Sequence, residues 1–148
     1  MDLSYQVKKI KKILVVDDEE DIRLLLSKFL KRQGFDVETA CDGHDALLKM
    51  KIFKADLILS DILMPVCDGY DFIKKLEVEF KPQPLLFFIS GYMGTKMNEI
   101  KNKSFVKGFM EKPIKINTLL DQIKELDYQL CQSLENPPAD STPTKTSK

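Results

Sequence analysis

The 148-residue sequence contains no tryptophan, a single histidine and only three cysteines. The cysteines have neither paired nor metal-type spacing, which argues against a disulfide scaffold and favours a reducing compartment. No run approaches 18 consecutive apolar residues, and the first nine residues lack the apolar middle of a secretory signal. The 23 basic and 23 acidic residues cancel, so no charge excess points to nucleic acid. We therefore expect a cytoplasmic protein that contacts neither nucleic acid nor membrane directly.

Apolar runs alternate with stretches of helical period five times along the chain. The runs that predict buried strands are Ile10 to Val16, Phe35 to Ala40, Ala55 to Ser60, Leu85 to Ile89 and Phe105 to Met110. The residues expected on inward helix faces are Ile22, Leu25, Leu26, Phe29, Leu30, Ala46, Leu47, Met50, Phe53, Phe72, Ile73, Leu76, Phe80, Leu119, Leu120, Ile123, Leu126 and Leu130. A short helix is also expected within residues 93–103. This alternation predicts an α/β three-layer sandwich with a parallel five-stranded sheet, most simply a flavodoxin-like (βα)5 fold of order 2-1-3-4-5.

The length fits one domain with a core of ordinary size. We expect residues 1–9 to form an N-terminal extension, residues 10–132 the domain, and residues 133–148 a disordered tail. The tail is rich in proline, serine, threonine and lysine, and no large apolar residue follows Leu134. Such a segment cannot bury enough surface to order itself.

Acidic residues follow two of the expected strands, at the point where each strand ends. Asp17 and Asp18 follow the first strand, and Asp61 follows the third. The carboxyl ends of parallel strands converge on one crevice, so these carboxylates should share a small volume. Two unit charges about 4 Å apart repel by roughly 4 kcal/mol at an effective dielectric near 20. The cluster therefore needs a cation, and hard carboxylate oxygens suit Mg²⁺.

Two further strand ends carry polar groups of another kind. Ser90 follows the fourth strand and Lys112 the fifth. Together with an acidic cluster, a hydroxyl and an ammonium suit a phosphoryl group, because Mg²⁺ bridges carboxylate and phosphate oxygens while serine and lysine bind the remaining oxygens. A carboxylate can also attack phosphorus and form an acyl phosphate.

At these residues the chain resembles the receiver domain of two-component response regulators, over about Lys11 to Leu130. The motifs that carry the resemblance are Leu14-Val15-Val16-Asp17-Asp18-Glu19, Asp61-Ile62-Leu63-Met64-Pro65, Asp68-Gly69, Ser90-Gly91 and Lys112-Pro113. A lone pair of aspartates is weak evidence, whereas the full set in this order is specific. The resemblance implies a phosphoacceptor signalling domain rather than a classical enzyme. Its phosphodonor would be a histidine kinase or a histidine phosphotransfer protein.

The resemblance also implies a role for each carboxylate. Asp61 would accept the phosphoryl group from phosphohistidine. Asp18, Asp61 and the backbone carbonyl of Leu63 would ligate Mg²⁺ directly, and Asp17 would bind the ion mostly through water. Lys112 would neutralise the phosphoryl group. The domain would catalyse its own Mg²⁺-dependent phosphorylation and dephosphorylation.

Signal output would begin at two other residues. Ser90 would hydrogen-bond the phosphoryl group, and the aromatic ring of Phe109 would move inward as that hydroxyl shifts. The Lys112–Pro113 bond resembles one that is cis in the family. The resemblance further implies output by protein–protein contact with an unidentified downstream protein, and a homodimer through the face of the fourth helix, fifth strand and fifth helix.

One finer hypothesis concerns the lifetime of the acyl phosphate. Leu63 and Tyr92 occupy positions that flank the path of the attacking water in the family. An aliphatic side chain and a bulky aromatic one should impede water, so we expect a comparatively long-lived acyl phosphate.

Several alternatives stay open. The chain could be a non-phosphorylated pseudo-receiver docking module, or a receiver fragment of a larger hybrid kinase or regulator. A phosphatase of the haloacid dehalogenase type also uses an aspartate nucleophile, but its chemistry requires a second aspartate, as general acid, at the position where this chain has Leu63. Taken singly, Asp17 and Asp18 could be an acidic helix start, Ser90 a turn former and Phe109 an ordinary core aromatic.

Overall fold

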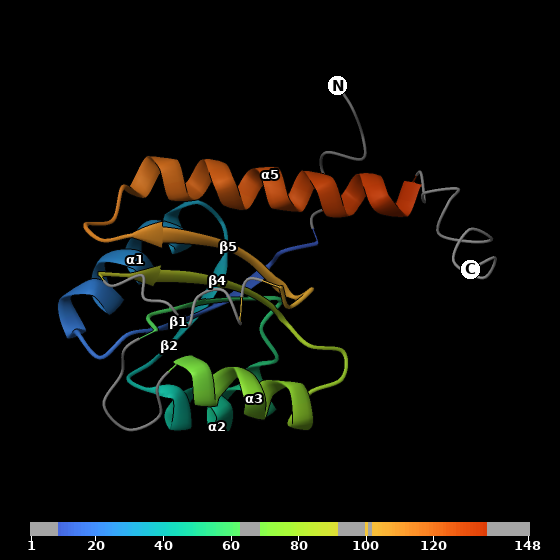
Figure 1. Ribbon diagram of the computed structural model, residues 1–148. Coiled ribbons are helices and arrows are strands. Elements are labelled where there is room, and N and C mark those ends of the chain that lie inside the picture. Colours follow the sequence, from blue (N-terminus) through green and yellow to red (C-terminus); the bar gives the residue numbers. More distant parts are fainter. Residues whose placement is uncertain (1–8, 63–68, 92–99, 101, 136–148) are drawn as a thin grey trace. The chain divides into compact units, whose positions relative to one another are not determined.

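The computed structural model describes residues 9–62, 69–91, 100 and 102–135 of the protein (Figure 1). The chain divides into two compact units. One is Ile10–Ile116, and the other combines Met1–Lys9 with Asn117–Lys148. The sheet and all the predicted site residues belong to the unit Ile10–Ile116.

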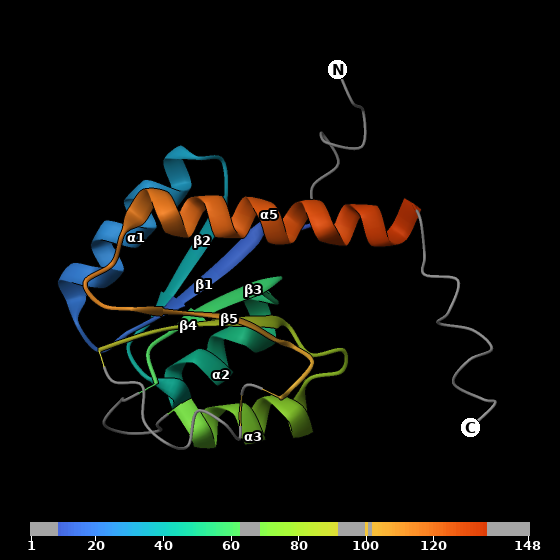
Figure 2. The same ribbon diagram turned by 45° about the horizontal axis from the view of Figure 1, so that its top comes forward.

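The sheet has five parallel strands in the order β2-β1-β3-β4-β5 (Figure 2). The strands are β1 (Lys12–Val16), β2 (Asp36–Ala40), β3 (Leu57–Ser60), β4 (Leu85–Ser90) and β5 (Val106–Glu111). All four residues of β3 are buried. Central strands of a parallel sheet are covered on both faces, which is why they are nearly continuous apolar runs. The predicted fold class and strand order are confirmed.

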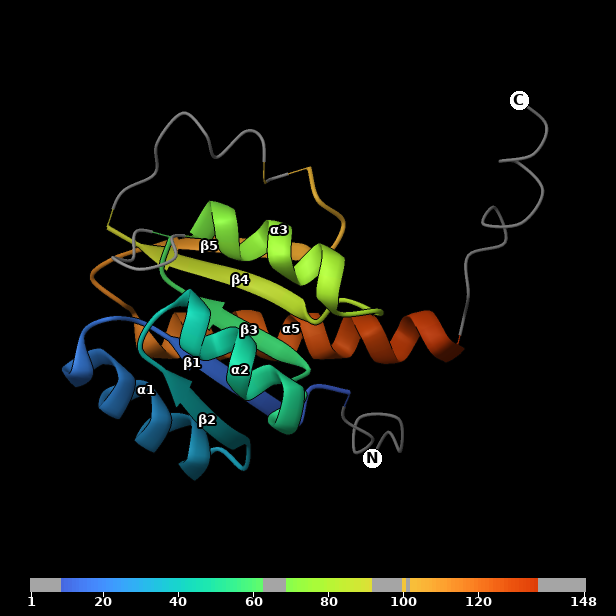
Figure 3. The same ribbon diagram turned by 90° about the horizontal axis from the view of Figure 1, so that it is seen from below.

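Helices lie on both faces of this sheet. The helices α2 (Gly43–Phe53) and α3 (Gly69–Glu79) lie on one face, and α1 (Glu20–Arg32) lies on the opposite face (Figures 1 and 3). A buried apolar cluster joins α2 and α3 to the sheet, and it includes Leu14, Val16, Ala46, Met50, Ile58, Phe72, Leu76, Leu86 and Phe88. This packing fixes the strands that carry the site.

The first strand is shorter than the sequence predicts. It begins at Lys12 rather than Ile10, although Ile10 is fully buried. The carboxylate of Asp56 accepts hydrogen bonds of 2.9 Å from the backbone N–H groups of both Lys11 and Lys12. The N–H groups of Lys11 and Lys12 are therefore satisfied by a side chain rather than by a neighbouring strand.

The inward face of α1 is narrower than the sequence predicts. Leu26 and Leu30 are buried as expected, but Leu25 is 49% exposed, so its predicted inward position is wrong. Leu26 and Leu30 are four residues apart and share one stripe, whereas Leu25 lies at the edge of that stripe. The helix leaves through Gly34, whose φ of 98° lies in the left-handed region that glycine adopts without strain.

The predicted start of α2 is confirmed by its cap. The carboxylate of Asp42 accepts a hydrogen bond of 2.8 Å from the backbone N–H of Asp45. Of the apolar residues predicted for the third helix, Phe72, Ile73 and Leu76 are buried, and Phe80 is partly buried just past the end of α3. The short helix expected within residues 93–103 lies largely outside the described residues.

The helix α5 (Ile116–Glu135) belongs to the other unit. Within this unit, the backbone N–H of Lys9 donates a 2.7 Å hydrogen bond to the Asp127 carboxylate. The helix extends to Glu135, three residues past the predicted domain limit of 132, and the predicted limits of the domain and the tail stay predictions. Residues 136–148 lie outside the described residues. Among the helices that the structure describes, none is long and apolar enough to cross a membrane.

Candidate functional site

The register of the sheet brings the predicted residues to one edge. Val16 pairs with both Ala40 and Ser60 at the carboxyl ends of β1, β2 and β3. Hydrogen bonds continue one residue past these ends, from the Asp17 N–H to the Ala40 carbonyl and from the Asp61 N–H to the Val16 carbonyl. The Lys112 N–H likewise donates to the Ser90 carbonyl at 2.9 Å. The predicted convergence of these strand ends is confirmed.

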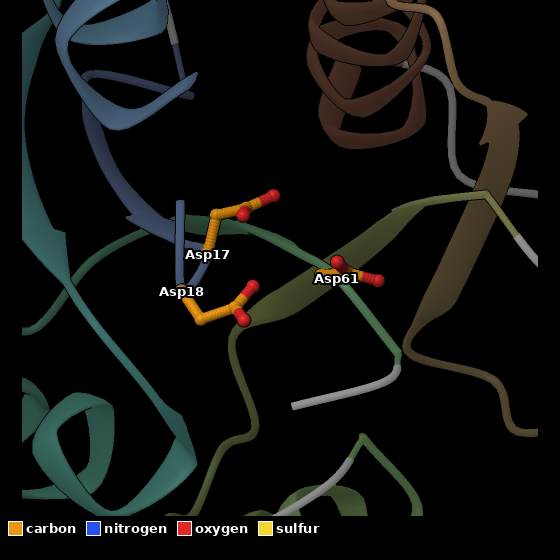
Figure 4. Close-up of side chains that lie close together, drawn as sticks. All are labelled: Asp17, Asp18 and Asp61. Atoms are coloured by element: carbon orange, nitrogen blue, oxygen red, sulfur yellow. The ribbon is translucent and has the colours of Figure 1, made fainter. Parts of the chain in front are cut away.

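Three carboxylates form the centre of the site. One oxygen each of Asp17, Asp18 and Asp61 lies within 4.8 Å of the other two. Figure 4 shows these side chains gathered at the ends of β1 and β3. Asp17 and Asp61 are buried, at 3% and 6% exposure, whereas Asp18 is exposed. Burial raises the pKa of Asp17, although hydrogen bonds from the Glu19 N–H and from Lys112 oppose the shift.

Lys112 is the cation that these carboxylates share. Its Nζ lies 2.9 Å from Asp17 Oδ2, 2.9 Å from Asp61 Oδ2 and 3.3 Å from Glu19 Oε1. Burial alone would lower the pKa of Lys112, but hydrogen bonds with Asp17 and Asp61 outweigh it and raise that pKa above its ordinary 10.5. The side chain is therefore an ammonium at neutral pH.

The donor set fits a divalent cation. The three carboxylates carry three formal negative charges and Lys112 carries one positive charge, which leaves a formal excess of two negative charges. The side-chain atoms that could ligate the ion are all carboxylate oxygens, which are hard ligands of the type that Mg²⁺ prefers. The Leu63 carbonyl, which the sequence predicts as a further ligand, lies outside the described residues. So does Tyr92.

The two predicted switch residues, Ser90 and Phe109, lie on β4 and β5 respectively. Ser90 is 1% exposed at the end of β4. Phe109 is half-buried, and its ring stacks on the ring of Phe88 with a centroid distance of 5.9 Å and an interplanar angle of 16°. The Lys112–Pro113 bond is cis, as predicted, and a second cis bond, Lys81–Pro82, was not anticipated.

Three contacts at this site escaped the sequence analysis. The Glu19 carboxylate reaches Lys112, and Arg23 Nη1 donates to the backbone carbonyl of Asp17 at 2.7 Å. The buried hydroxyl of Ser60 donates to the Asp61 carbonyl at 2.8 Å. Glu19 belongs to the first motif of the resemblance, whereas only nearness in sequence to an aspartate of the cluster pointed to Arg23 and Ser60.

Comparisons with known proteins agree with this geometry. The response regulator receiver domain family matches residues 13–124. The alkaline phosphatase synthesis transcriptional regulatory protein PhoP of Bacillus subtilis is 49% identical over 76 residues, which cover 51% of this chain and 32% of PhoP. The autoinducer 1 sensor kinase/phosphatase LuxN of Vibrio harveyi is 35% identical over 107 residues, which cover 72% of this chain and 12% of LuxN. The chain thus spans less than two thirds of the length of either relative.

Solved structures show the same likeness. The chemotaxis protein CheY4 of Vibrio cholerae has a TM-score of 0.69 and 30% identity, with 78% of this chain and 98% of CheY4 covered. The response regulator TrrA of Thermotoga maritima in complex with Mg²⁺-BeF has a TM-score of 0.67 and 28% identity, with 79% of this chain and 99% of TrrA covered. On the match over residues 13–124 and the strand-end cluster, this chain belongs to the response regulator receiver domain family of two-component signalling.

Proposed function

We propose that Asp61 of this receiver domain accepts a phosphoryl group from the phosphohistidine of a histidine kinase or a histidine phosphotransfer protein. The observation that carries the proposal is the ammonium of Lys112, 2.9 Å from both Asp17 and Asp61 within a cluster of three carboxylates. A structural ion pair would need only one carboxylate. A site with a surplus of oxygen ligands and one shared cation suits phosphoryl transfer assisted by a divalent ion.

The chemistry requires no general base. An oxygen of the ionised Asp61 carboxylate attacks phosphorus, and the P–N bond to the donor imidazole breaks with its electron pair left on nitrogen. Asp18 and Asp61 would hold Mg²⁺ directly and Asp17 mostly through water, and the bound ion would supply positive charge to the phosphoryl oxygens. Lys112 provides a second positive charge at the same place, because its high pKa keeps it protonated. Hydrolysis of the acyl phosphate later restores the carboxylate.

Ser90 and Phe109 would read the phosphorylated state. Ser90 ends the strand next to β3, so its hydroxyl would hydrogen-bond a phosphoryl oxygen on Asp61. Phe109 of β5 pairs with Phe88 of β4, and Phe88 lies two residues before Ser90 on the same strand. A shift of the Ser90 hydroxyl would then bias the position of the Phe109 ring, as in a two-state equilibrium.

Output would be protein–protein contact with a downstream partner rather than turnover of a small substrate. The limits of 10–132 for the domain, the homodimer, the cytoplasmic location and the lack of direct nucleic-acid contacts stay predictions. Most of the fourth helix expected on the dimer face lies outside the described residues.

Phosphorylation by acetyl phosphate tests the proposal. Incubation with acetyl phosphate and Mg²⁺ should add one phosphoryl group to the intact mass. Asp61→Asn should abolish the addition, as should chelation of Mg²⁺. Asp71→Asn, which changes an exposed carboxylate of α3, is the matched control and should leave the addition unchanged. If the wild-type chain gains no phosphoryl group, the pseudo-receiver docking module becomes the better reading.

A further inference from the structure

Every polar group of Asp17 is held by a different partner. Its N–H donates to the Ala40 carbonyl, its Oδ1 accepts from the Glu19 N–H, and its Oδ2 contacts Lys112. Its carbonyl accepts a 2.7 Å hydrogen bond from Arg23 Nη1. Of these four contacts, the Arg23 contact alone comes from a side chain of α1, and it is short enough to be a charge-assisted bond.

The Arg23 contact controls more than Asp17. The carbonyl of Asp17 and the N–H of Asp18 belong to one planar peptide unit. Fixing that carbonyl therefore fixes the peptide plane from which the Asp18 backbone continues. Asp18 lies two residues past the end of β1 and two residues before α1, which begins at Glu20. The carboxylate of Asp18 is exposed, so burial does not fix its orientation.

We propose that Arg23 is a positioning residue of the divalent-cation site: it holds the Asp17–Asp18 peptide so that the Asp18 carboxylate faces those of Asp17 and Asp61. This inference rests on the proposed function of the cluster as a Mg²⁺ site. It assigns to α1 a side chain that touches neither the ion nor the phosphoryl group.

The charge of Arg23 makes the proposal sharply testable. A guanidinium near the cluster repels a divalent cation, so its charge alone would weaken Mg²⁺ binding. Removing that charge would then tighten binding. Removing a positioning contact has the opposite effect, because outer-shell partners of metal ligands are typically worth about 10- to 100-fold in affinity. The sign of the change separates the two roles.

Calorimetric titration of the full chain with MgCl₂ alone tests the sign. Arg23→Met should weaken Mg²⁺ binding by at least about tenfold. Arg23→Lys keeps the charge and an N–H donor, so its affinity should fall between those of Arg23→Met and wild type. The matched control is Arg32→Met, which removes an exposed arginine from the last turn of the same helix and should leave the affinity unchanged.

A second readout reports the peptide plane without any metal. In ¹⁵N–¹H spectra of the metal-free chain, Arg23→Met should shift the Asp18 amide, and Arg32→Met should not. Thermal unfolding shows whether each variant is folded. If Arg23→Met does not fold, Arg23→Lys decides the matter, because the positioning role predicts weaker Mg²⁺ binding and a shifted Asp18 amide, whereas a charge effect predicts wild-type values for both.

The outcomes also separate this inference from the proposed function. Equal or tighter Mg²⁺ binding by a folded Arg23→Met overturns the positioning role and leaves the site intact. If the wild-type chain does not bind Mg²⁺, or if Asp18→Asn binds it as tightly as wild type, the cluster is not the proposed site and both conclusions fail.

Discussion

Replacement of Lys112 by methionine should destabilise the protein strongly when no divalent ion is present. The ammonium lies 2.9 Å from carboxylate oxygens of Asp17 and Asp61, and these side chains are 18%, 4% and 8% exposed. Methionine fills a similar volume but carries no charge. The substitution therefore leaves two buried carboxylates facing each other and Asp18 without their shared cation.

The magnitude follows from the geometry. At 2.9 Å, each contact with Lys112 is worth about 6 kcal/mol at an effective dielectric near 20, before the cost of burial is subtracted. Two carboxylate oxygens within 4.8 Å of each other repel by at least about 3 kcal/mol at the same dielectric. Loss of one partner from a buried ion pair typically costs about 3–5 kcal/mol, and we expect a loss in this range. That is a large share of a typical total stability of about 5–15 kcal/mol.

Urea denaturation at neutral pH, with a metal chelator present, measures this loss in the free energy of unfolding. Lys107→Met is the matched control, because Lys107 is an exposed lysine of β5. The double variant Lys112→Met/Asp61→Asn should recover part of the stability, since one carboxylate of the repelling pair is neutral. Saturating MgCl₂ should narrow the gap between Lys112→Met and wild type, because the ion supplies charge to the same oxygens. If Lys112→Met is no less stable than Lys107→Met, the electrostatic account of the site is wrong.

Three further predictions concern packing, pH and lifetime. Gly108→Ala should cost about 1–3 kcal/mol in a denaturation experiment, because a Cβ there would lie 2.4 Å from the Phe87 ring, whereas Gly91→Ala, with open space around it, should cost much less. The raised pKa of Asp17 means that the folded chain binds a proton at the Asp17 carboxylate more tightly than the unfolded chain does. With a metal chelator present, the wild type should therefore gain stability relative to Asp17→Asn as the pH falls toward 3.8. A stability difference that does not change with pH would contradict this prediction. Leu63→Asn combined with Tyr92→Glu should speed loss of the phosphoryl group measured by intact mass, and an unchanged rate would refute the proposed shielding from water.

The sequence predicted the elements and the meeting of the strand ends because both follow from periodicity and topology. Alternation of apolar runs with helical stretches implies a parallel sheet, and a parallel sheet places Asp17, Asp61 and Lys112 at one edge. The motif order then identified the family. None of these steps needs side-chain detail.

What the sequence could not predict depends on side-chain direction and local packing. The exposure of Leu25 depends on how wide a stripe of α1 the sheet covers. The Asp56 carboxylate accepts hydrogen bonds from the N–H groups of Lys11 and Lys12, a contact that periodicity does not reveal. The contact of Arg23 with a backbone carbonyl leaves no trace in hydrophobic periodicity. Such contacts depend on which residues become neighbours in three dimensions, and Asp56 and Lys11 are 45 positions apart in the sequence.

The central claim is that the phosphoryl group is carried by Asp61. The most direct measurement is borohydride reduction of the chain after incubation with acetyl phosphate and Mg²⁺, because borohydride converts an aspartyl phosphate to homoserine. Tandem mass spectrometry of the peptides should then find homoserine at position 61 and unmodified aspartate at positions 17 and 18. Homoserine at another aspartate, with position 61 unchanged, would contradict the account.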